Sequence, residues 1–185
     1  MTSIRRCFTA LALTLASATG AFTPPAYAES GAGLAADGHA ALNALYANST
    51  KATRFGRTAV AILVFPKIIK AGLLIGGQGG EGVLFVRGKA TAYYKIAAVS
   101  YGLQAGGQSF SYALFFMNNK ALAYLSKSDG WSIGSGPSVV VMDKGKAMSN
   151  TSTTITEDVY AFPFGQKGLM AGLGLEGSKI TPIKK

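Results

Sequence analysis

The chain has 185 residues, of which 49% are hydrophobic and 14% charged, with 18 Lys and Arg residues against 8 Asp and Glu residues. This composition excludes a disordered chain, and the length suits one domain rather than a large multidomain enzyme. A single Cys and a single His exclude a disulfide framework and leave no basis for a metal cluster, so we expect no metal and no cofactor. The formal charge of +10 indicates an anionic partner or surface.

Residues 1–28 have the pattern of a secretory signal peptide. Arg5 and Arg6 precede an uncharged run over residues 8–21, and Ala26 and Ala28 supply the short side chains that signal peptidase requires. We therefore expect cleavage after Ala28. Export predicts a periplasmic or secreted protein and argues against nucleic acid as a natural partner.

Cleavage at this position would change the charge and the cysteine content. Loss of Arg5 and Arg6 lowers the formal charge from +10 to +8, and loss of Cys7 leaves no cysteine. Cys7 lies before the apolar run rather than at its end, so it is badly placed to carry the lipid of a lipoprotein. A cysteine-free chain suits an oxidising compartment and excludes thiol catalysis.

The start of the mature chain predicts a lead-in and then a helix. Residues 29–36 are rich in Gly and Ala and are expected to form a flexible lead-in, followed by a single domain over 37–185. Asp37 is a candidate cap for an amphipathic helix over residues 39–48. The apolar residues at helical spacing are Leu42, Leu45 and Tyr46.

A second helix is expected immediately afterwards, capped by Ser49 or Thr50. Its cations, Lys51, Arg54 and Arg57, recur every three residues, which places them broadly on one side of the helix. This is the densest basic face that the sequence predicts.

The remainder of the chain has strand character interrupted by glycines. The apolar run over residues 60–65 indicates a strand buried on both faces and ended by Pro66, and the glycines of 76–82 indicate bends or close backbone packing. Further strands are expected at 83–86, 93–96, 110–117, 139–142, 159–164 and 168–177, with an edge segment at 149–156 and a helix from Asn118 or Asn119 to about Ser126. The expected fold is α+β, with short N-terminal helices packed on a dominant, mostly antiparallel, glycine-rich sheet that is open or barrel-like.

No constellation of residues supports catalysis, and we predict that the protein is not an enzyme. The segment Gly77–Gly82 contains G-x-G-x-x-G, but a β-branched strand follows it where a dinucleotide site needs a helix. His39 is the only histidine, and the adjacent Glu157 and Asp158 would point to opposite faces of a strand. No catalytic residue is therefore assigned.

Five basic residues are candidates for contact with lipid phosphates. They are Lys51, Arg54, Arg57, Lys67 and Lys70. Each Lys or Arg near an anionic membrane contributes about 1 kcal/mol. The alternative is an ordinary solvated basic face.

Three glycine-rich motifs resemble those of the SYLF lipid-binding domain family. They lie at residues 64–84, where Val64-Phe65-Pro66-Lys67 precedes the glycine run, at residues 102–108, and at residues 167–177. The resemblance implies a phosphoinositide- or phospholipid-binding module, some of whose eukaryotic members also bind actin. It further implies that a basic N-terminal segment contacts lipid, which here corresponds to Lys51, Arg54 and Arg57, with Lys67 and Lys70 as an extension.

We therefore expect a non-enzymatic exported protein that associates peripherally with membranes by binding anionic phospholipid through a basic face. The alternative is an envelope structural or protein-interaction module with an envelope protein as its partner. A small outer-membrane barrel is disfavoured because the runs at residues 60–65 and 114–117 lack strict alternation.

Overall fold

The computed structural model describes residues 30–127, 129–142, 156–168 and 177–185. The expected signal peptide lies outside these residues, as do most of the segments predicted at 149–156 and 168–177. The elements in chain order are α1 (Gly31–Asn48), α2 (Thr50–Thr58), β1 (Ala61–Val86), β2 (Lys89–Phe116), α3 (Asn119–Leu122), a 3-10 helix η1 (Ala123–Ser126), β3 (Trp131–Ser132), β4 (Val139–Val141), β5 (Val159–Gly168) and β6 (Lys179–Ile183).

A long hairpin of β1 and β2 forms the centre of the sheet. The two strands have 26 and 28 residues and pair antiparallel from Ala61 with Phe116 to Val86 with Lys89. Arg87 and Gly88 form the turn between them, both with positive φ, as a two-residue hairpin turn requires. The other edge of β2 pairs with β6 and β5, and the short β3 and β4 extend the sheet at its two ends.

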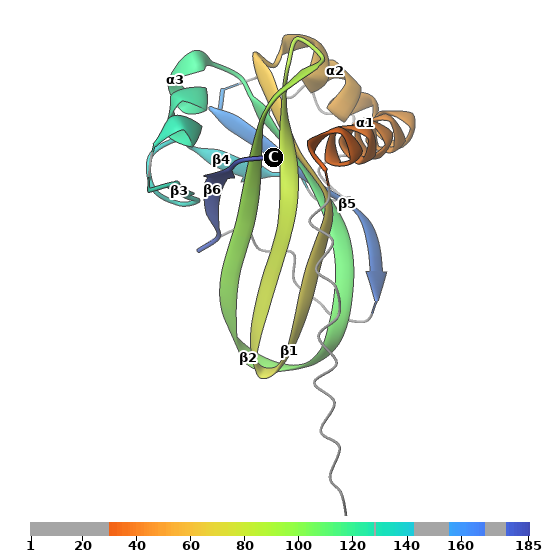
Figure 1. The fold of residues 1–185 in the computed structure, drawn as a ribbon, viewed down its shortest axis with the longest axis vertical. Coiled ribbons are helices and arrows are strands. Elements are labelled where there is room, and N and C mark those ends of the chain that lie inside the picture. Colours follow the sequence, from red (N-terminus) through yellow and green to blue (C-terminus); the bar gives the residue numbers. More distant parts are fainter. Residues whose placement is uncertain (1–29, 128, 143–155, 169–176) are drawn as a thin grey trace, which may run out of the picture.

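Pairing within the described residues is antiparallel except between β4 and β5. The helices α1 and α2 pack on the sheet at one end of the molecule (Figure 1). The prediction of an α+β fold with N-terminal helices on a mostly antiparallel sheet is confirmed.

The hairpin bends sharply and doubles back along its own length, so that the sheet curls (Figure 1). The register between β1 and β2 shifts between Leu73 and Ile75, in the middle of β1. As a result, the first and second halves of β1 lie against each other. The end of the molecule with this bend is opposite the end that carries α2 (Figure 1).

Glycines in the second half of β1 permit this contact. A Cβ atom built on Gly82 would lie 2.5 Å from Cδ1 of Phe65 and 2.7 Å from the carbonyl oxygen of Val64. One built on Gly80 would collide with the carbonyl oxygen of Lys67. The glycine run is therefore part of a continuous strand, and its lack of side chains lets one half of the strand approach the other.

The curled sheet has a hydrophobic cluster on each face. The inner cluster contains Phe65, Ile68, Tyr112 and Trp131, all fully buried. The outer cluster joins the helices to the sheet and includes Leu34, Leu42 and Leu45 of α1, Ala52 and Phe55 of α2, and Val64, Val83, Phe85, Phe115, Tyr160 and Phe162 of the strands. Burial on both faces explains the continuous apolar run expected at residues 60–65.

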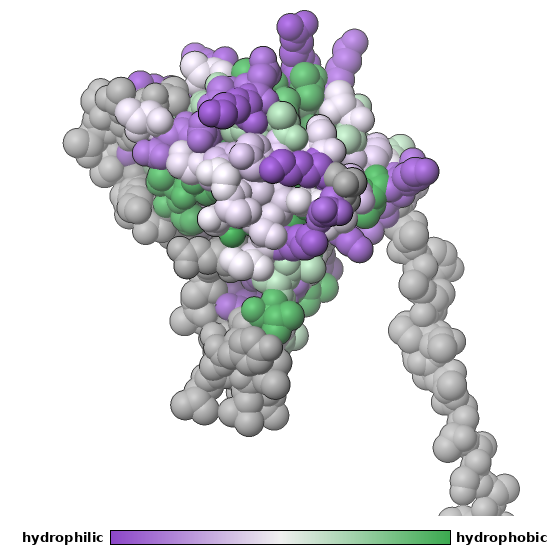
Figure 2. Space-filling view, turned by 90° about the vertical axis from the view of Figure 1, so that its left-hand side faces the viewer, coloured by the Kyte–Doolittle hydropathy of each residue, from purple (hydrophilic) through white to green (hydrophobic). Residues whose placement is uncertain are grey.

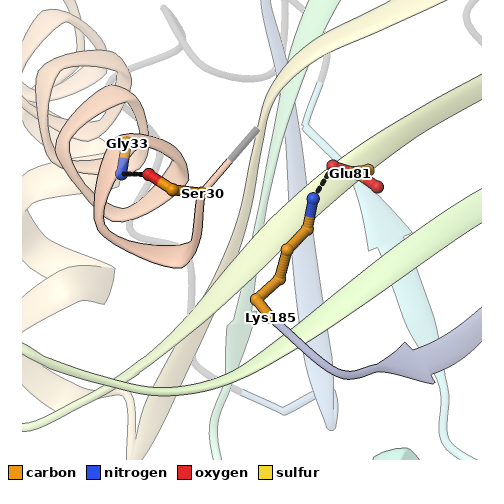
Figure 3. A network of polar contacts seen from close by, with 4 residues as sticks. All are labelled: Ser30, Gly33, Glu81 and Lys185. Atoms are coloured by element: carbon orange, nitrogen blue, oxygen red, sulfur yellow. Dashed lines mark hydrogen bonds and ion pairs between the residues drawn. The ribbon is translucent and has the colours of Figure 1, made fainter. Parts of the chain in front are cut away.

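Three predictions about local structure are wrong. Asp37 was expected to cap the first helix but lies inside α1. Residues 30–36 were expected to belong to a flexible lead-in, but α1 begins at Gly31, because Ser30 caps it by accepting a hydrogen bond at Oγ from the Gly33 N–H at 3.1 Å (Figure 3), and Leu34 is buried. Pro66 was expected to end the first strand, but β1 continues through it at a register shift between Phe65 and Ile68. Its carbonyl accepts a hydrogen bond from Ser111 Oγ at 2.7 Å.

Other local predictions are confirmed. Ser49 caps α2 by accepting a hydrogen bond from the Ala52 N–H at 3.1 Å, and Asn118 caps α3 through the Ala121 N–H at 2.8 Å. The expected strands at 139–142 and 159–164 correspond to β4 and β5.

We predict that Gly80→Ala lowers the free energy of unfolding by about 1–3 kcal/mol, because its methyl group would overlap the backbone at Lys67 and crowd Ile68. The matched control is Gly79→Ala, whose Cβ would lie 3.6 Å from its nearest neighbour, an ordinary contact. Urea denaturation followed by circular dichroism measures both. Equal stability of the two variants would contradict the tight contact between the halves of β1.

Asp158 joins the starts of α3, β4 and β5. Its carboxylate accepts hydrogen bonds from Nδ2 of Asn118 at 2.8 Å and from the backbone N–H of Ser138 at 3.1 Å. These two hydrogen bonds, with the amide of Asn118 contributing most, hold the pKa of Asp158 below its ordinary value of 3.8.

Asp158→Asn should therefore lower the free energy of unfolding at neutral pH by about 1–2 kcal/mol. A carboxyl group whose pKa is lower in the folded state stabilises the fold fully at pH values above its ordinary pKa. This stabilisation is lost as the pH falls through the folded-state pKa. The difference between the wild type and the variant should shrink as the pH falls below 3.8. Denaturant titrations across this pH range test the prediction, and a constant difference would contradict it.

Candidate functional site

The cations of α2 point away from the hydrophobic core. Phe55 is 2% exposed, and its ring stacks on that of Tyr160 with centroids 4.3 Å apart. This contact fixes the orientation of α2, so Arg54 and Arg57 are exposed and Lys51 is half-buried. The predicted basic face of this helix is therefore present as a surface.

A cleft of about 270 Å³ lies where α1, α2, the start of β1 and the hairpin turn meet. Arg87 of the turn and His39 and Tyr46 of α1 line it, together with Gly56 of α2. The His39 ring lies over Phe85 with centroids 4.2 Å apart. No sequence signal connects Arg87 with α2, because the turn is distant in sequence and only the doubled hairpin brings it to this end.

Lys67 belongs to a different part of the surface. It is exposed on β1 and lines a cleft of about 550 Å³ between α1 and the sheet. Lys167 of β5 lines the same cleft, with Asp37 and Ser109. Lys167 is not among the five predicted site residues, although it begins one of the glycine motifs.

Lys70 faces the interior. Only 7% of it is exposed. Its register partner on β2 is Gln108, which is 4% exposed. Gln108 Oε1 accepts a hydrogen bond from Gln166 Nε2 at 3.3 Å. Such burial is at odds with a direct contact between Lys70 and a membrane surface.

The five predicted cations therefore do not form one face. Three lie on α2, Lys67 lies in the cleft beside α1, and Lys70 is buried. The structure assembles the α2 group and separates the two lysines of β1 from it.

Other chemistries find little support in the described residues. No group of three or more His, Cys, Asp or Glu residues could hold a metal ion in the described part of the chain. Glu81 instead forms an ion pair with Nζ of Lys185 at 2.6 Å (Figure 3). Gly77–Gly82 lies inside β1, so no helix follows it to hold a phosphate. Among the described helices, none has the length and apolar character needed to cross a membrane.

Comparison with known proteins identifies two similarities. Residues 97–185 match the Ysc84 family model, described as "Las17-binding protein actin regulator". The chain is also 28% identical over 129 residues to "SH3 domain-containing YSC84-like protein 1" of Bos taurus. That match covers 66% of this chain but only 38% of the relative, so the chain spans about two fifths of the relative's length. The family model begins within β2, so α1, α2 and β1 precede the segment it matches.

The different positions of the two β1 lysines give a direct test. With a water-soluble amine-reactive acylating reagent, Lys67 should react several-fold faster than Lys70, because Lys70 is 7% exposed whereas Lys67 is exposed. Peptide mass spectrometry at short reaction times measures both rates. Both lysines should react at similar rates after denaturation in urea. Similar rates in the native protein would contradict the inward orientation of Lys70.

Proposed function

Because the chain belongs to the Ysc84 (SYLF) family of binding domains, we propose that it is a non-enzymatic protein that binds anionic phospholipid membranes through the cationic face of α2. The observation that carries the proposal is the anchoring of α2. Its buried Phe55 holds one side of the helix to the sheet and leaves Arg54 and Arg57 turned to solvent.

The expected strength follows from the number of cations. At about 1 kcal/mol for each cation near an anionic surface, Lys51, Arg54 and Arg57 contribute about 3 kcal/mol together, or about a hundredfold in affinity. The exposed Arg87, across the cleft from α2, adds to the positive potential at this end. Because exposed charges are screened over about 8 Å at physiological salt, this binding should weaken as salt increases.

The proposal includes export. The pattern of residues 1–28 would direct the protein across a membrane, and the remaining chain would carry a formal charge of +8. Its ligand would then be anionic phospholipid of the envelope, and the protein would be periplasmic or secreted and peripherally associated with the membrane.

A protein-interaction role is the second candidate. It is favoured by the description of the family, which names Las17 binding and actin regulation. For an exported protein, the corresponding partner would be an envelope protein bound by the same fold.

Co-sedimentation with vesicles tests the lipid proposal, using the chain from Glu29, which holds every described helix and strand. The wild type should bind vesicles containing phosphatidylglycerol at low salt and ignore pure phosphatidylcholine. Reversal of Lys51, Arg54 and Arg57 to Glu should lower the affinity at least about a hundredfold.

The matched control reverses three exposed lysines that lie outside α2. They are Lys120, Lys127 and Lys184. The control changes the net charge equally but should retain most of the binding. Equal losses in the two variants would show that net charge alone drives binding and would contradict a role for α2. A wild type that ignores anionic vesicles would contradict lipid binding itself, and capture of an envelope protein would then support the second candidate.

A further inference from the structure

The end of the molecule opposite α2 carries exposed apolar residues on its outer surface. Among residues whose exposure the structure describes, the two exposed large hydrophobic residues are Ile69, 54% exposed, and Val99, 67% exposed. Ile69 lies on β1 between the buried Ile68 and Lys70, so it points outward. On β2, the buried Tyr94 and Ile96 point inward. Val99 is an odd number of residues from both, so it points outward.

Beyond the buried Lys70, charge is absent from the strand segments that lead from these two residues into the bend. Residues 71–80 contain no Asp, Glu, Lys, Arg or His, and neither do residues 96–119. These segments include the bend of the hairpin and the strands leading into it. In Figure 2, hydrophilic residues cover the upper part of the visible face and a hydrophobic patch lies near the lower end of the described surface.

Four exposed lysines border this uncharged region on the same outer face. They are Lys67, Lys95, Lys167 and Lys179. Lys67 lies two residues before Ile69, and Lys167 pairs with Ser109, which itself pairs with Ile69. Lys179 pairs with Ala97, two residues before Val99. We call these four residues the lysine border.

Two acidic residues among those described lie near the lysine border. Asp37 of α1 lines the same cleft as Lys67 and Lys167. Glu81 is the register partner of Lys95 on β2. Its carboxylate is 2.6 Å from Nζ of Lys185, which neutralises it in the folded protein. Four lysines against the remaining carboxylate of Asp37 leave the border with a positive charge.

We infer that this bent end of the hairpin is a second lipid-contact surface, in which Ile69 and Val99 enter the membrane while the lysine border binds lipid phosphates. The inference rests on the proposed binding to anionic membranes but assigns a surface separate from α2. Lys67 and Ile69 are two residues apart on β1, a separation of about 7 Å along the strand. A lysine at the level of the phosphates would therefore place Ile69 within the depth of about 5–10 Å that interfacial apolar residues reach below the headgroups.

The observed chemistry favours a membrane over a protein partner. Near Ile69 and Val99, the outward positions of β1 whose exposure the structure describes are Ala71, Gly77 and Gly79, which offer one methyl group and no larger side chain to anchor a specific protein partner. An uncharged surface bordered by cations is complementary to a bilayer with an apolar interior and anionic phosphates.

Site-specific fluorescence tests insertion directly. The chain from Glu29 lacks cysteine, because Cys7 is the only one in the sequence. Ile69→Cys and Val99→Cys would each carry an environment-sensitive nitrobenzoxadiazole label, with Asn119→Cys and Ser126→Cys as exposed controls on α3 and η1. With vesicles of phosphatidylcholine and phosphatidylglycerol, labels at 69 and 99 should shift to the blue and be quenched by nitroxide-bearing acyl chains, and the control labels should do neither.

A binding experiment complements the fluorescence. Ile69→Ser/Val99→Ser should weaken vesicle binding about tenfold at a salt concentration that screens the α2 cations. Circular dichroism should show a native fold, since both residues are more than half exposed.

The outcomes separate this inference from the proposed function. If the wild type binds vesicles while labels at 69 and 99 behave like the control labels, the inserted surface is wrong and lipid binding stands. If the wild type ignores vesicles, both fail. A blue shift that depends on protein concentration without vesicles would indicate self-association through this end and would overturn the membrane assignment.

Discussion

The contact between the two halves of β1 is the constraint on which the rest of the structure depends. Phe65 and Ile68 lie over Gly82 and Gly80, and any larger residue there would hold the halves apart. This contact lets one hairpin supply both sides of a curled sheet. It also places Val64 of the first half beside Val83 and Phe85 of the second in the cluster that α1 covers. The position of both N-terminal helices therefore follows from the glycines.

The same folding back determines what each end of the molecule presents. The hairpin turn returns to the end where α2 lies, so Arg87 joins the surroundings of the α2 cations. The bend occupies the other end, in a part of the chain without charged residues. Positive charge borders both ends, but only the bent end combines it with exposed Ile69 and Val99. Two surfaces of different character thus arise from one pair of strands.

Local signals predicted much of this arrangement. Cap residues and helical spacing identified α2 and the direction of its cations, and the apolar run at 60–65 identified the buried start of β1. The orientation of the two β1 lysines was not predictable, because it depends on the irregularity beside Pro66. Strict alternation from the inward Phe65 would turn residues 67 and 69 inward, but the register shift instead turns Ile68 and Lys70 inward. The start of α1 was missed because Gly and Ala carry little pattern, and the cap at Ser30 was not recognised.

The two-residue turn at Arg87 and Gly88 has a consequence for the order of folding. The first pair beyond it, Val86 with Lys89, is three residues apart in sequence, whereas the last, Ala61 with Phe116, is 55 apart. Each pair closes only a small additional loop once the previous one has formed, so the entropic cost of the distant pairs is spread over many small steps. We expect the hairpin to zip outward from this turn, with β5 and β6 docking on β2 afterwards. The topology thus converts a sheet of long-range contacts into a sequence of local ones.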